Sequence, residues 1–188
     1  MRFTPVLLLC LTHSPGASGQ IPDGTPWERV EVVALDSSKA ADQLYTTAKR
    51  WFVDAFKDSK AVIEFDDAAT HTIVGNGSFT YEPTIFLGSD ARRGSMRYTI
   101  EVSCKDGRYR VKLSNYTHTA SAGLGTILSD STVCSGAIGQ GYGTPGKPTA
   151  YLKRVCKEEA VPMIQDNETK LLASLKAAML KPAGPSDW

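Results

Sequence analysis

The sequence predicts an α+β domain made of one strand, one long helix and four further strands. Three observations predict it: a β-branched run near residue 30, a broad aromatic stripe at helical spacing, and alternating polar and apolar residues up to about residue 118. Alternation with a period of two is typical of antiparallel strands that bury one face, and the aromatic stripe is typical of a helix laid across a sheet. The expected order along the chain is β-α-β-β-β-β.

The first strand is predicted over 30–35, where valines are frequent, and it is followed by Asp36-Ser37-Ser38. The short side-chain oxygens of these three residues are expected to cap the next helix. That helix is predicted from Lys39 to Asp58. Its apolar stripe and the aromatic residues beside it are Leu44, Tyr45, Ala48, Trp51, Phe52, Ala55 and Phe56.

Two strands are predicted over 61–66 and 72–81, and the short break between them indicates a hairpin. Gly75 and Gly77 lie inside the second of these strands. A glycine within a strand marks a bulge or a close approach of another segment. We expect close packing of the helix on the sheet rather than approach of a ligand.

The strands predicted over 96–105 and 108–116 alternate almost without interruption. They are expected to form an antiparallel hairpin with one buried face. Asp106-Gly107 is expected to close this hairpin as a type I′ turn.

Three stretches carry a family likeness: the helix with Tyr45 and Trp51, Ile63-Glu64-Phe65-Asp66-Asp67 in the first hairpin, and Asp106-Gly107-Arg108-Tyr109-Arg110 in the second. In this order they resemble a bacterial, Bacteroidetes-type exported domain of unknown function with a TATA-binding-protein-like (TBP-like) fold. The resemblance implies a curved antiparallel sheet of about five strands with a crossing helix over 28–118. It implies no activity, and a fold shared with a DNA-binding protein is not evidence for binding DNA.

Beyond this domain, residues 119–150 are rich in glycine and lack periodicity, which predicts a functional loop or a mobile insertion. Residues 151–181 return to helical spacing, and Pro162 is expected to kink or split this C-terminal helical segment. Residues 182–188 are expected to form a loose tail. The apolar stripe of the helical segment consists of Ile164, Leu171, Leu172, Leu175 and Met179.

Residues 1–19 have the pattern of a secretory signal peptide, because Arg2 precedes a short apolar run and Ala17-Ser18-Gly19 supplies small residues before the cut. Cys10 follows Leu9 rather than a small residue, so a lipoprotein signal is less favoured. No segment is apolar for the roughly 20 residues that a membrane span needs. A periplasmic or extracellular location is therefore expected.

Loss of Arg2 with the leader brings the 21 Lys and Arg residues into balance with the 20 Asp and Glu residues. This balance argues against a nucleic-acid binder. The three remaining cysteines allow one disulfide and one thiol. We predict a disulfide between Cys134 and Cys156, and buried or unpaired thiols are the alternative. The cysteine spacing fits no metal site, and no cofactor is expected.

The segment Gly141–Lys147 has the glycine spacing of a phosphate-binding loop, but Pro148 stands where a Ser or Thr would hold magnesium. We therefore interpret it as part of a glycine-rich loop. Asp66 and Asp67 are neighbours that are expected to point apart, so a turn is favoured over paired catalytic carboxylates or a calcium site.

Candidate nucleophiles and bases are few. His71 and His118 lie in or beside predicted strands, and no recognisable triad motif connects them with a serine. For Cys134, a disulfide or an idle thiol is favoured over a nucleophile.

A basic set lies on the polar phase of the last two predicted strands and is expected to share one side of the sheet. Left uncovered by the C-terminal helices, this side forms a basic, slightly concave surface. A solvated face is the plain interpretation, and a binding face for an acidic partner or an anionic glycan is the specific alternative, which Glu101 weakens. The set contains Arg97, Lys105, Arg108, Arg110 and Lys112.

We therefore predict a non-enzymatic exported protein of the bacterial cell envelope. It is expected to bind an envelope protein or an anionic ligand through its open sheet face or its glycine-rich loop. Two other hypotheses stay open: a hydrolase that uses Cys134 or a His with a carboxylate, and a structural module that docks through residues 171–179. A cleft containing those groups would favour the first, and an uncovered apolar stripe would favour the second.

Overall fold

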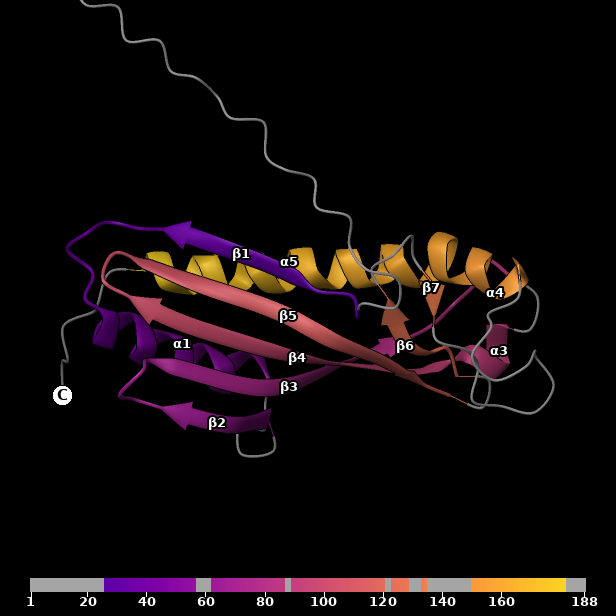
Figure 1. Ribbon diagram of the computed structural model, residues 1–188, viewed down its shortest axis with the longest axis horizontal. Helices are drawn as coiled ribbons and strands as arrows, with labels where there is room; N and C mark the ends of the chain where they lie inside the picture. Colours follow the sequence, from indigo (N-terminus) through magenta and orange to yellow (C-terminus); the bar gives the residue numbers. More distant parts are fainter. Residues whose placement is uncertain are drawn as a thin grey trace, which may run out of the picture.

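The computed structural model describes residues 26–56, 62–86, 89–120, 123–128, 133–134 and 150–181. Its sheet has the strand order β2-β3-β4-β5-β6-β7, and β1 pairs with β5 beside this path (Figure 1). Neighbouring strands are antiparallel. The described strands are β1 (Arg29–Ala34), β2 (Ile63–Asp67), β3 (Thr72–Tyr81), β4 (Gly94–Lys105), β5 (Arg108–Thr119), β6 (Gly125–Leu128) and β7 (Val133–Cys134). The described helices are α1 (Ala41–Ala55), α3 (Ser89–Arg92), α4 (Ala150–Val155), the π-helical turn η1 (Cys156–Ala160) and α5 (Val161–Leu180).

The predicted α+β class and the order β-α-β-β-β-β are confirmed by β1, α1 and β2 to β5. The prediction of a loop over 119–150 is wrong for β6 and β7. With only four residues, β6 is too short for alternation to reveal it. Its position depends on distant partners instead, because it pairs with the end of β5 and the Ile127 carbonyl accepts the Trp27 backbone N–H at 2.8 Å.

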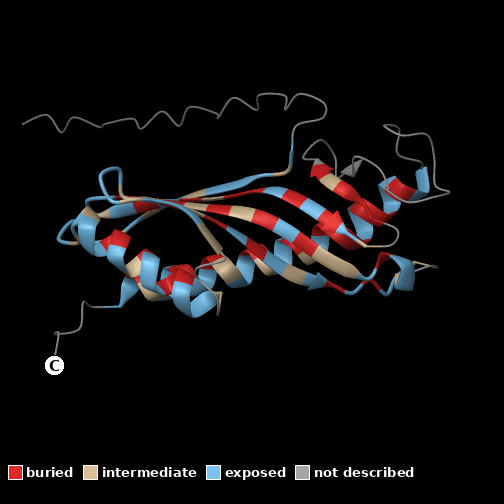
Figure 2. Ribbon diagram, turned by 90° about the horizontal axis from the view of Figure 1, so that it is seen from below, coloured by how far each residue is buried: buried red, intermediate tan, exposed pale blue. Residues whose placement is uncertain are grey.

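The helices α1 and α5 cover one face of the sheet (Figures 1 and 2). On β4, every second side chain from Met96 to Cys104 is buried, and these side chains belong to the same core as those of α1 and α5. The indole Nε1 of Trp51 in α1 donates a hydrogen bond to Ser174 Oγ in α5 at 3.0 Å. The alternate side chains of β4 therefore lie on the opposite side of the sheet, away from both helices.

The cap of α1 differs from the sequence prediction. Ala40 precedes the helix without a side-chain cap, and the Asp36 carboxylate instead accepts the Ser38 N–H at 2.9 Å within its own turn. Asp106 Oδ1, from the turn between β4 and β5, accepts the Ala41 N–H at 2.8 Å. That turn is not type I′, which needs positive φ at both central residues, since Gly107 has a φ of 67° and Asp106 has no positive φ.

The predicted close packing of the helix on the sheet is confirmed at Gly75, whereas Gly77 is packed against a ring of the neighbouring strand β4. A Cβ atom on Gly75 would lie 2.6 Å from the Val62 carbonyl oxygen and 3.0 Å from the Phe52 ring. A Cβ atom on Gly77 would lie 2.4 Å from the Tyr98 ring. Neither position therefore has room for a side chain, because atoms of neighbouring residues occupy the space.

Replacing Gly77 by Ala is expected to lower the free energy of unfolding by about 1–3 kcal/mol, because the new methyl group must displace the Tyr98 ring. That ring stacks on Tyr116 with centroids 5.4 Å apart. Urea denaturation followed by circular dichroism measures the loss. Ser78→Ala, at the exposed neighbouring position, is the control and should stay within about 0.5 kcal/mol of the wild type. Equal losses in the two variants would contradict the close approach.

Pro162 follows an irregular helical turn but does not break the helix. The turn η1 is π-helical, and the Val161 N–H donates to the Cys156 carbonyl, five residues back. Pro162 lies in the first turn of α5, directly after η1, and because it has no N–H it makes no hydrogen bond back to that turn. The expected interruption thus takes the form of a π turn, and the described chain continues helically through α4, η1 and α5.

Candidate functional site

The side of the sheet opposite α1 and α5, here called the open face, carries the basic residues predicted from the sequence. Cross-strand pairing sets Lys105 beside Arg108, Ser103 beside Arg110 and Glu101 beside Lys112. Arg97 lies on the same face but six residues along β4 from Ser103, a separation of roughly 20 Å. The structure therefore brings four of the five cations together and leaves Arg97 at the other end.

Two of the grouped cations have acidic neighbours. Arg110 forms an ion pair with Glu101, and Lys112 Nζ lies 2.8 Å from Glu28 Oε2. Among the described residues, Lys105, Arg108 and Arg97 have no ion-pair partner, and all three are exposed. Solvent-exposed ion pairs are weak, so an incoming anion can compete for Arg110 as well.

A depression of about 430 Å³, here called the basic pocket, lies beside this group. Hydroxyl groups of Thr70, Thr72 and Ser103 line it together with the cations Lys105, Arg108 and Arg110. Thr72 Oγ1 lies 3.2 Å from the Thr70 carbonyl oxygen and 3.3 Å from Ser103 Oγ, so it is held in place between these two residues. The hydroxyl protons of Thr70 and Ser103 are donated to Asp67 and Glu101, so the cations are the groups of this pocket that suit an oxyanion.

The cysteine beside the basic pocket is not equipped for nucleophilic chemistry. Cys104 is free and buried, and burial raises the pKa of its thiol to about 12. The thiol therefore stays protonated at neutral pH, and only the thiolate is a strong nucleophile.

The predicted disulfide partners are only partly described. Cys156 is fully buried and disulfide-bonded. The backbone of β7, which contains Cys134, contacts α4 and η1. The side chain of Cys134 lies outside the described part of the chain, so its pairing with Cys156 stays a prediction. The predicted leader, the segment Gly141–Lys147 and the tail 182–188 also lie outside the described residues.

The two histidines lie apart and in different surroundings. His71 Nε2 is 2.9 Å from Asp42 Oδ1 at the surface. His118 is buried, its Nδ1 accepts the Leu124 N–H at 2.9 Å, and burial lowers its pKa. Within the described residues no serine, threonine or cysteine side chain is hydrogen-bonded to either ring. The geometry of a catalytic triad is therefore absent from that part of the chain.

Asp66 and Asp67 point apart, as the sequence predicts. Asp67 accepts the Ala69 N–H at 2.9 Å and the Thr70 hydroxyl at 2.7 Å, so it closes a turn. Asp66 accepts hydrogen bonds from the Lys49 ammonium and the Tyr45 hydroxyl, and these two contacts lower its pKa. No group of three metal-ligating side chains occurs among the described residues.

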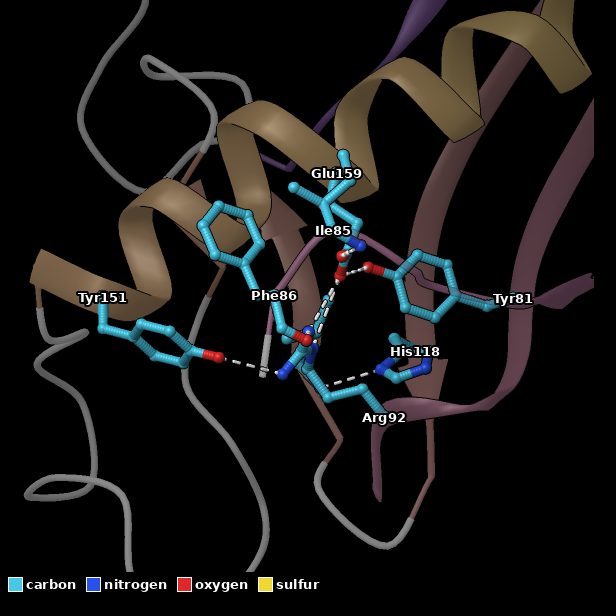
Figure 3. A network of polar contacts seen from close by, with 8 residues as sticks. Tyr81, Ile85, Phe86, Arg92, His118, Tyr151 and Glu159 are labelled. Atoms are coloured by element: carbon cyan, nitrogen blue, oxygen red, sulfur yellow. Dashed lines mark hydrogen bonds and ion pairs between the residues drawn. The ribbon is translucent and has the colours of Figure 1, made fainter. Parts of the chain in front are cut away.

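A buried ion pair that was not predicted from the sequence joins η1 to α3 (Figure 3). Glu159, only 2% exposed, lies 3.3 Å from Arg92 Nη2, and Arg92 is only 5% exposed. Glu159 also accepts the Tyr81 hydroxyl at 3.0 Å and the Ile85 N–H at 3.1 Å. These contacts join the C-terminal helical segment to the segment between β3 and β4.

Glu168 of α5 is a second enclosed carboxyl group, with no exposed surface. Its Oε1 accepts the Trp27 Nε1–H at 3.0 Å, and its Oε2 lies 3.8 Å from Arg29 Nη1. Burial raises the pKa of Glu168, although Trp27 and Arg29 act in the opposite direction. The charged form of this side chain therefore reduces stability at neutral pH relative to a neutral one.

We expect the Glu168→Gln variant to gain stability over the wild type as the pH rises from about 4.5 to 7. The ordinary pKa of this group is 4.5, and a raised folded-state pKa means that the stability contribution of the protonated Glu168 side chain is lost progressively as the pH rises above this value. Urea denaturation at pH 4.5, 5.5 and 7 measures the difference. Glu158→Gln, at an exposed position of η1, is the control, and a Glu168→Gln difference that is constant with pH would contradict the burial effect.

An antiparallel sheet with helices on one face and a polar, open opposite face places the domain in the α+β class of TBP-like proteins. The family model described as "Domain of unknown function (DUF4468) with TBP-like fold" matches residues 30–119. This match confirms the resemblance predicted from the sequence.

Two solved structures are similar to the chain. A DUF4468 family protein from Bacteroides ovatus ATCC 8483 is 19% identical with a TM-score of 0.55, over 84% of this chain and 90% of that one. A TBP-like protein from Parabacteroides distasonis ATCC 8503 is 11% identical with a TM-score of 0.51, over 79% of this chain and 92% of that one. At these identities the likeness shows the fold alone. The comparison with curated proteins gives no match.

Proposed function

We propose that the protein is an exported, non-enzymatic binding module of the bacterial cell envelope that holds an anionic ligand on its open face. The basic pocket carries this proposal. Lys105, Arg108 and Arg110 converge with three hydroxyl groups on a side of the sheet that neither α1 nor α5 covers. Charge-assisted hydrogen bonds from such donors are stronger than neutral ones.

A further observation supports the proposal. The disulfide at Cys156 is typical of proteins that fold in an oxidising compartment, which agrees with the predicted signal peptide. The described helices include none that is long and apolar enough to cross a membrane.

The proposal is tested with the combined variant Lys105→Gln, Arg108→Gln and Arg110→Gln. We expect it to bind carboxylate polymers, poly-L-glutamate or polygalacturonate, at least about tenfold more weakly than the wild type, because three donors to the anion are lost. Isothermal titration calorimetry at two salt concentrations measures the affinity.

The matched control replaces Lys153, Lys157 and Lys176 by Gln, which removes the same charge from exposed helical positions. An equal loss in both variants would mean that net charge, rather than the open face, governs binding. Failure of the wild type to bind either polymer would overturn the proposal.

The two other hypotheses receive no support from the described residues. Leu172, Leu175 and Met179 are buried, so the C-terminal stripe is not available for docking another chain. His71 has a carboxylate partner in Asp42, but no nucleophile is bonded to the ring.

A further inference from the structure

A second depression, of about 590 Å³, lies on the open face at the end marked by Arg97. Apart from Arg97, its polar lining consists of amide and hydroxyl side chains: Asn76, Ser78, Thr99, Asn115 and Thr117 among them. This polar groove therefore differs from the basic pocket in chemistry, although both lie on the same face.

Hydrogen bonds connect these side chains in a row across four strands. Asn115 Nδ2 of β5 donates to Thr99 Oγ1 of β4 at 3.3 Å, and Thr99 Oγ1 donates to Asn76 Oδ1 of β3 at 3.2 Å. Asn76 Nδ2 in turn donates to Glu64 Oε1 of β2. We call this row the amide ladder. Its members hold one another in fixed directions, and Glu64, Asn76 and Asn115 are exposed to solvent.

A bulge in β5 turns Asn115 toward this row. Thr99 pairs with Ser114 and Arg97 with Thr117, so two residues of β5 stand opposite one residue of β4. Asn115 has a φ of 58°, an uncommon conformation for a residue other than glycine. Leu113 is buried, and regular alternation would have buried residue 115 as well, whereas Asn115 is exposed. Bulges of this kind re-aim a side chain.

The groups on the open face indicate which class of polymer could bind across both depressions. A peptide bound as an added strand needs free backbone groups, but β3, β4 and β5 are paired on both sides. A single-stranded nucleic acid needs aromatic platforms. Four tyrosine rings of the sheet are instead buried in the core on the helical side. Phe65, which pairs with Val74, is an exposed ring on the open face, but a single ring does not give successive bases a series of stacking platforms. Fixed amides and hydroxyls match the hydroxyl groups of sugars.

We propose that the ligand of the open face is an extended acidic polysaccharide lying along β4. Its anionic groups contact Lys105 and Arg108 in the basic pocket, and its sugar hydroxyls exchange hydrogen bonds with the amide ladder roughly 20 Å away. This inference rests on the proposed function and adds the class of ligand to it.

Three polymers distinguish the polysaccharide inference from the proposed function of anion binding. Polygalacturonate has carboxylates and hydroxyls, poly-L-glutamate has carboxylates without sugar, and dextran has sugar without charge. We expect the wild type to bind polygalacturonate about tenfold more tightly than poly-L-glutamate at equal carboxylate concentration, with dextran weakest. The expected factor corresponds to one or two additional hydrogen bonds.

The double variant Thr99→Val and Asn115→Gly breaks the amide ladder and should lose this tenfold preference while keeping its affinity for poly-L-glutamate. Valine keeps the shape of threonine, and glycine accepts the positive φ of residue 115, so the fold is expected to persist. Thermal melting checks this. Thr80→Val, on the same face and outside the lining of the groove, is the matched control.

Equal affinity for the two anionic polymers, or a preference that survives the double variant, would overturn the polysaccharide inference and leave the proposed function standing. Tighter binding of a single-stranded oligodeoxythymidylate than of polygalacturonate would also overturn it. Binding of dextran as tight as that of polygalacturonate, or no binding of either anionic polymer, would overturn both claims.

Discussion

Replacing Arg92 by Met is expected to lower the free energy of unfolding by about 3–5 kcal/mol, because it leaves the carboxylate of Glu159 buried without its counter-charge. Glu159 is 2% exposed, so water cannot solvate the abandoned charge. The hydrogen bonds from Tyr81 and Ile85 remain but do not neutralise it. Urea denaturation at pH 7, followed by circular dichroism, gives the difference.

A double variant separates the buried charge from the loss of packing. Arg92→Met combined with Glu159→Gln keeps an acceptor for Tyr81 but removes the charge, so it should be more stable than Arg92→Met alone. Lys170→Met is the control for an exposed pair, since Lys170 and Asp166 lie 2.6 Å apart with side chains 73% and 63% exposed. Its cost should stay below about 1 kcal/mol. A loss in Arg92→Met as small as this would show that the buried pair contributes no more than a surface one.

The sequence predicted the elements whose causes are local. The hairpin of β4 and β5 follows from alternation within 20 or so neighbouring residues, and the packing at Gly77 follows from a missing side chain inside a strand. Alternation also predicted that the basic residues share one face. In each case the pattern and its structural cause lie within a single element or its direct neighbour.

Features that join distant segments could not be predicted in this way. Asp106 caps α1 from 65 positions away, and Arg92 meets Glu159 across 67 positions. An acid three residues after a cysteine in a helical pattern carries no sign that it will be buried against an arginine. Two of the hydroxyl residues that complete the basic pocket, Thr70 and Thr72, come from the turn before β3 and from β3 itself, and only the strand register brings them beside the cations of β5.

For the same reason, only the cationic part of the candidate site could be predicted from the sequence. The cations were predicted to share one face because they fall on the polar positions of a period-two pattern. The amide ladder depends instead on a bulge, which exchanges the buried and exposed positions of β5 after Ser114. A period-two pattern assigns Asn115 to the core, and the structure exposes it. Polar residues that fall in the apolar phase of a strand are thus positions where a bulge, and with it a binding group, should be sought.

Replacing Phe52 by Ala is expected to cost about 3–5 kcal/mol, because the ring fills the space between α1 and the sheet. Phe52 has no exposed surface, and it packs edge-on against Trp51 with ring centroids 5.2 Å apart. Gly75 lies against this ring and has no side chain that could fill the cavity left by its removal. Chemical denaturation measures the cost.

Val53→Ala is the matched control, since Val53 is the next residue of α1 and is 50% exposed. It should change the free energy of unfolding by no more than about 0.5 kcal/mol. Phe52→Leu should fall between the two, because leucine retains part of the buried volume. A cost for Phe52→Ala below about 2 kcal/mol would mean that α1 can settle onto the sheet after the ring is removed, and Gly75 would then permit movement of the helix rather than fix its position.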